Sequence, residues 1–156
     1  MGRNNQIVIA LFCILAILPV IDYLTDQSYD RISGGGNPGI VPIFILVIPT
    51  IWFAVRFVSF IKEQSFDMGA LIVSLPPAAI YNIWGFKQIP KRLEHIAYDF
   101  LRTFERGDWG SSLDGLTFYT NNVYFNPTTF MMFLTWLILI GMAWSIIEKN
   151  RDGTKL

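Results

Sequence analysis

Hydrophobic residues in this chain gather in long uncharged blocks. No ionisable side chain lies between Arg3 and Asp22, and residues 39–55 and 128–147 are almost entirely apolar. A helix needs roughly 20 apolar residues to cross the hydrocarbon core of a bilayer, and helices in soluble cores are normally shorter and apolar on one side only. The pattern therefore predicts an all-α integral membrane protein, one polytopic domain over 1–156, with spans at about 5–23, 39–61 and 128–147.

A fourth uncharged stretch, residues 68–86, is long enough to cross but has Pro76-Pro77 at its centre. Two adjacent prolines remove two backbone donors and disfavour a regular helix. The stretch is either a re-entrant hairpin that turns at the prolines or a broken fourth span. In both cases we expect it to pack against protein rather than bare lipid.

Residues 89–106 have the pattern of an amphipathic helix. Pro90 suits its first turn and Gly107 its end. Charged residues of both signs occupy one face, and an apolar stripe occupies the other: Ile89, Leu93, Ile96, Ala97, Phe100, Leu101 and Phe104. We expect this helix to lie in the membrane interface and to contact a protein. Residues 107–127 follow as a loop rich in aromatic and polar residues.

The distribution of Lys and Arg gives an orientation. With the N-terminus inside and a re-entrant 68–86, eight basic residues lie inside and four outside; with four full spans the split is six to six. The count favours three spans plus a hairpin. The first apolar run has no small-residue cleavage site after it, so we read it as a retained helix. We expect the bacterial cytoplasmic membrane, with the N-terminus inside.

Composition narrows the chemistry. The chain is 53% hydrophobic and 15% charged with zero net charge, which gives no basic surface for nucleic acid. A single cysteine, Cys13, excludes an intrachain disulfide, and a single histidine, His95, excludes histidine pairs for haem or a di-metal centre. Apart from Asp22 at the end of the first span, Arg56 is the only charge within the three clear spans. We therefore expect no enzyme activity, no cofactor and no metal; the pattern leaves bound lipid open, and the aromatic residues leave pigments and quinones open too.

Seven residues are candidates for lipid or partner contact. Arg56 lies near the end of the second span, where its side chain can reach the headgroups. Gly141 and Ser145 form a small-xxx-small pair in the last span that allows close helix packing. The remaining candidates are in the broken segment and on the amphipathic stripe: Pro76, Pro77, Phe100 and Phe104.

The function that fits best is a small non-enzymatic subunit of a larger multi-protein membrane complex, with a structural, assembly or accessory role in secretion, conjugation or energy conversion. Its partners would be membrane lipids and other membrane protein subunits, contacted through residues 68–106 and the last span. The alternative is a homo-oligomeric channel or holin-like pore lined by 68–86, with Ser74 and Asn82 facing the lumen. A lipid-modifying enzyme that uses His95, Asp99 and Arg102 is the weakest hypothesis.

Overall fold

A computed structural model describes residues 2–26, 40–104 and 121–153, and this part of the chain is helical without strands. Four long helices, α1 (Arg3–Asp26), α2 (Ile40–Lys62), α3 (Met68–Phe104) and α5 (Pro127–Gly153), are accompanied by the single turn α4 (Asn121–Tyr124). Each long helix contains a stretch long and apolar enough to cross a membrane. The protein is thus of the all-α membrane class.

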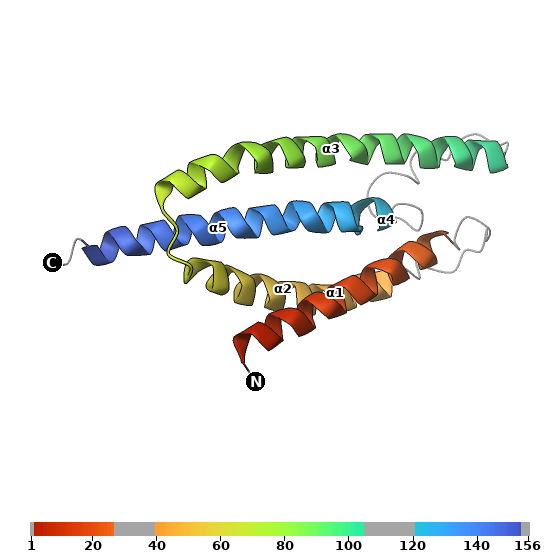
Figure 1. Ribbon diagram of the computed structural model, residues 1–156. Coiled ribbons are helices and arrows are strands. Elements are labelled where there is room, and N and C mark those ends of the chain that lie inside the picture. The colour runs from red at the N-terminus through yellow and green to blue at the C-terminus, as the bar shows by residue number, and fades with distance from the viewer. Residues whose placement is uncertain (1, 27–39, 105–120, 154–156) are drawn as a thin grey trace.

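Among the long helices, α5 lies between α3 and the pair formed by α1 and α2 (Figure 1). One side of α5 packs against α2, which in turn packs against α1, and the other side packs against α3. Successive helices run in opposite directions, so that the N-terminus, the α2–α3 connection and the C-terminus share one end of the bundle (Figure 1). We call this the terminal end. The opposite end, where α1 finishes and α4 and α5 begin, is called the distal end.

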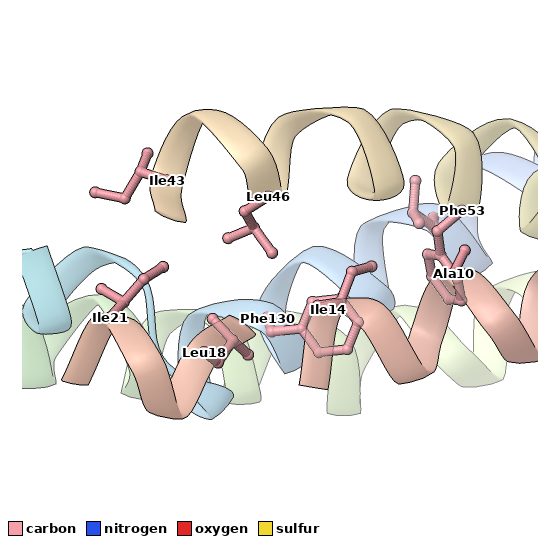
Figure 2. Close-up of a cluster of buried hydrophobic side chains, with 9 residues drawn as sticks. Ala10, Ile14, Leu18, Ile21, Ile43, Leu46, Phe53 and Phe130 are labelled. Carbon is pink, nitrogen blue, oxygen red and sulfur yellow. The ribbon is translucent and has the colours of Figure 1, made fainter. Parts of the chain in front are cut away.

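One stripe of α1 forms the core with α2 and α5 (Figure 2). Ala10, Ile14, Leu18 and Ile21 are spaced by three or four residues and so lie on one face of the helix. They meet Ile43, Leu46 and Phe53 of α2 and Phe130 and Leu137 of α5. The opposite face of α1 is equally apolar but exposed, with Phe12 at 73%. A helix that is apolar on all sides is typical of a membrane span.

Ion pairs join three helices at the terminal end. Arg3 of α1 pairs with Glu63, just after α2, and Lys62 Nζ lies 2.9 Å from Glu148 Oε2 of α5. Lys62 Nζ also lies 5.4 Å from the ring centroid of Trp144. These side chains are partly exposed, so the pairs contribute about 0–1 kcal/mol each to stability. Their main effect is to fix which helix ends meet at this surface.

The predicted hairpin at Pro76-Pro77 does not form. Residues 68–104 make one continuous helix of 37 residues that contains Pro76, Pro77 and Pro90. A hairpin apex would leave about four unpaired backbone groups at each of two helix ends, whereas continuing the helix through two prolines removes only two hydrogen bonds. Of the two alternatives for 68–86, the structure therefore shows the apolar helix. The Lys and Arg count favoured the hairpin because it considers only the charges and takes no account of unpaired backbone groups.

The amphipathic segment is also part of α3 rather than a separate helix in the plane of the membrane. Residues 89–104 continue the axis of the apolar half, and the helix extends past the other elements at the distal end (Figure 1). At 1.5 Å per residue, α3 is about 55 Å long, well above the roughly 30 Å of a hydrocarbon core. Of the predicted loop 107–127, residues 107–120 lie outside the described residues.

A local hydrogen-bond motif starts α5. Asn126 Oδ1 accepts from the backbone N–H groups of Thr128 and Thr129 at 2.9 and 3.2 Å, and the N–H of Asn126 donates to Thr129 Oγ1 at 3.1 Å. Pro127 occupies the first helical position, where its missing N–H has no cost. This reciprocal cap fixes the start of α5 one residue earlier than the sequence pattern indicated.

The arrangement predicts which introduced cysteines are accessible from the same side of the membrane. In a Cys13→Ala background, Ser65→Cys and Lys149→Cys at the terminal end should react with an impermeant maleimide from one side. Lys91→Cys, on α3 beyond its apolar half, should react from the other side. Labelling of Lys91→Cys and Ser65→Cys from the same side would show that α3 does not cross.

Candidate functional site

The seven candidate residues do not gather in one place. Arg56 lies on an exposed face of α2 and has no hydrogen bond or ion pair to any described residue. Pro76 and Pro77 are exposed on α3. Gly141 and Ser145 are buried on α5. Phe100 and Phe104 belong to the helical part of α3, but their side chains are outside the described residues.

Gly141 lies where α5 meets α2 of the same chain. A Cβ at this position would come within 2.6 Å of Ile61 Cγ2 and 3.3 Å of the Val58 carbonyl oxygen. The absence of a side chain therefore lets the two helices approach closely. Ser145, one turn later, is 6% exposed. The small-xxx-small face is thus occupied by intrachain packing.

The contact between α3 and α5 is made by small and polar residues. Asn82 is 5% exposed, and its Nδ2 donates to Thr135 Oγ1 of α5 at 2.7 Å and to the Ala78 carbonyl at 2.8 Å. Ser74 Oγ lies 3.6 Å from Met142 Sδ. Gly85 faces Met132, whose Sδ would lie 2.3 Å from a Cβ at position 85. Asn82 and Ser74 therefore hold α3 on α5 instead of facing a lumen.

Sequence reasoning missed this interface, although a signal for it exists. Ser74, Ala78, Asn82 and Gly85 recur every three or four residues, which places them on one face of an uninterrupted helix. The assumption of a break at Pro76-Pro77 hid that register. Thr135 lies within the apolar block 128–147, and it accepts the hydrogen bond that Asn82 donates across the interface.

The opposite side of α3, which we call the outer face, has no neighbour among the described helices. It consists of exposed residues on the side away from α5: Val73, Pro76, Pro77, Ala79, Ile80 and Ile83. Since proline has no N–H, the carbonyls of Ile72 and Val73 lose their usual donors four residues later. Both residues are exposed, at 59% and 75%. The outer face thus combines a large apolar surface with a helix segment in which two carbonyls lack their usual helical donors.

The described residues contain no group of three or more His, Cys, Asp or Glu side chains that would hold a metal ion. Besides the Cys13 thiol and the Arg56 guanidinium, the described polar side chains within the apolar parts of the helices carry amide, hydroxyl and indole groups. Asn82 and Thr135 show that such groups form hydrogen bonds between helices.

Packing at Gly141 predicts a matched pair of stability changes. Gly141→Ala should lower the free energy of unfolding by about 1–3 kcal/mol, because the added methyl overlaps Ile61 and the α2 backbone. Gly69→Ala, in the first turn of α3, meets only Asp67 Oδ1 at 3.4 Å and should be neutral or stabilise by up to about 1 kcal/mol. Thermal unfolding in detergent micelles measures both. Equal effects from the two alanines would contradict the close α2–α5 contact.

Comparisons of the chain with models of protein families, with curated proteins and with solved structures find no match.

Proposed function

We propose that this protein is a small non-enzymatic subunit of a larger multi-protein membrane complex, with a structural, assembly or accessory role and no cofactor. The observation that supports this proposal most strongly is the outer face of α3. An edge helix that presents two carbonyls without their helical donors is poorly suited to lipid, because hydrocarbon offers no donor to replace them. A neighbouring subunit with a Ser, Thr, Asn or backbone N–H at this depth would supply one.

The distal half of α3 supports the same proposal. From Lys87 to Phe104 the helix continues for about 27 Å beyond its uncharged part, and its sequence has one apolar stripe and one charged face. An amphipathic helix is stable when its stripe is covered. A partner that covers this stripe would bind the distal half of α3 on a different side from the outer face.

The alternative, a homo-oligomeric pore lined by 68–86, has less support. A water-filled lumen needs polar groups on the face that copies of the chain present to one another. Asn82 and Ser74 instead point toward α5, and the outer face carries Val73, Ile80 and Ile83. Copies of this chain joined through the outer face would enclose an apolar space.

The kind of membrane and the orientation belong to the proposal. We infer a bacterial cytoplasmic membrane with the N-terminus inside and a contribution to secretion, conjugation or energy conversion. If all four long helices cross, both termini lie on the same side and the Lys and Arg count is six to six. That balance gives neither orientation an advantage in the number of basic residues.

Blocking the outer face tests the proposal. The native complex should be purified in mild detergent and its subunits identified by mass spectrometry. Ala79→Trp places a bulky ring on the outer face. It should lower the amount of partner subunits that co-purify with the protein at least tenfold. Ala16→Trp adds the same ring to an exposed alanine of α1 and should leave them bound.

Two results would contradict the proposal. If wild-type protein purifies as a pure homo-oligomer that conducts ions in liposomes, the pore hypothesis replaces the subunit hypothesis. If the partner subunits are released equally by Ala79→Trp and Ala16→Trp, α3 does not provide the contact. Circular dichroism and thermal unfolding of both variants confirm that each retains its helices.

A further inference from the structure

A chain of three hollows runs between the helices at the distal end. The innermost has a volume of about 280 Å³ and lies between α1, α2 and the start of α5. Its lining is almost wholly apolar and includes Leu18, Leu46, Val47, Ile51, Phe130 and Phe133. An engineered apolar cavity of about 150 Å³ accepts benzene, so this hollow has room for several methylene groups of a chain.

The other two hollows lead from this cavity to the membrane surface. One, of about 330 Å³, shares Leu18, Phe125 and Asn126 with the apolar cavity and is also lined by Asp22 and Arg92. The outermost, of about 270 Å³, shares Asp22 and Arg92 and adds Lys91, His95 and Asn122. Shared lining residues make the three hollows neighbours, apolar at one end and charged at the other.

The change from apolar to charged lining along the hollows follows the change from hydrocarbon to headgroups across a membrane leaflet. Asp22 is the first charge of α1 after Arg3, and Lys87 is the first charge of α3 after Asp67. Arg92 and Lys91 therefore lie just beyond the uncharged parts of the helices, at the level of lipid headgroups. The apolar cavity, lined by residues such as Leu46 and Phe130, lies deeper. The charged end of the three hollows therefore lies at the depth of a phospholipid headgroup, and the apolar end lies at the depth of its acyl chains.

The charge at the mouth selects a negative headgroup. Lys91 and Arg92 are exposed and form no ion pair with a described residue. The carboxylate of Asp22 faces the same hollows, and its Oδ1 accepts a hydrogen bond from Asn122 Nδ2 at 3.1 Å. The mouth thus has two fixed cations and one carboxylate already held by an amide. Arginine binds a phosphate through two parallel N–H donors. Since neutral phospholipids carry a phosphate too, the preference for a negative headgroup comes from the excess of cations over carboxylates at the mouth.

We propose that these hollows form a binding site for one anionic phospholipid of the leaflet at the distal end. Its phosphate binds Arg92 and Lys91, and one acyl chain enters the cavity between α1, α2 and α5. The site does not involve the outer face of α3, so it stands independently of the proposed subunit role. It adds to the core cluster by filling the space beside Ile14, Leu18 and Phe130.

Native mass spectrometry of the detergent-purified protein tests this site. The probes are phosphatidylglycerol and phosphatidylcholine with identical acyl chains, added in equal amounts. Wild-type protein should retain one phosphatidylglycerol in preference to phosphatidylcholine. Arg92→Gln should reduce that preference about fivefold, since one basic residue near an anionic surface contributes about that factor. Lys87→Gln, an exposed cation of α3 that does not line the hollows, should leave it unchanged.

A second pair of variants tests the cavity without altering the charges. Val47→Trp fills the apolar cavity from an exposed position of α2 and should abolish retention of both lipids. Ile48→Trp places the same ring on the neighbouring residue, which does not line the cavity, and should behave as wild type.

Three outcomes would overturn the site: equal retention of the two lipids by wild-type protein, equal weakening by Arg92→Gln and Lys87→Gln, or full retention by Val47→Trp. The first would show that the protein has no preference for a negatively charged lipid, and the second would indicate only diffuse attraction of anionic lipids to the helix surface. Far-UV circular dichroism establishes that each variant is folded before its lipid is counted.

Discussion

The constraint on which this structure depends is the absence of water as a hydrogen-bond partner inside the bilayer. Every backbone N–H and C=O at that depth needs a partner within the protein. This is why α1, α2 and α3 continue as helices through Pro19, Pro49 and Pro76-Pro77. Each proline removes one hydrogen bond, whereas ending a helix in hydrocarbon would expose several groups. The outer face of α3 is where this constraint is least satisfied, which is the basis of the proposed subunit contact.

The second influence on the fold is close packing around α5. Within lipid, helices gain little from the hydrophobic effect and associate through van der Waals contact and interhelical hydrogen bonds. Gly141 brings α5 close to α2, while Gly85 and the Asn82–Thr135 hydrogen bond bring α3 to the other side of α5. A helix with two such faces therefore lies between α3 and the pair formed by α1 and α2. The distal hollows lie between α1, α2, α3 and the start of α5.

The sequence pattern was sufficient for the fold class but not for the arrangement. The three uncharged blocks correspond to α1, α2 and α5, because each block is apolar on every side and needs no knowledge of its neighbours. The path of 68–104 depends on whether a helix through two prolines or a hairpin leaves fewer backbone groups without a hydrogen bond. The prolines alone indicate a break and do not give this comparison. The role of Asn82 depends on Thr135, 53 positions away, and no local pattern joins the two. The hollows involve Asp22, Arg92 and Phe130 from three helices, and only their packing brings these residues together.

The continuity of α3 within the membrane is the central claim, and a distance across its prolines tests it most directly. Spin labels on cysteines at Met68 and Phe86, both exposed, in a Cys13→Ala background permit a pulsed dipolar measurement in lipid nanodiscs. A continuous helix separates these backbone positions by about 27 Å. A hairpin that turns at Pro76-Pro77 would bring them to about 10 Å, the usual distance between packed helices, and that result would contradict the account.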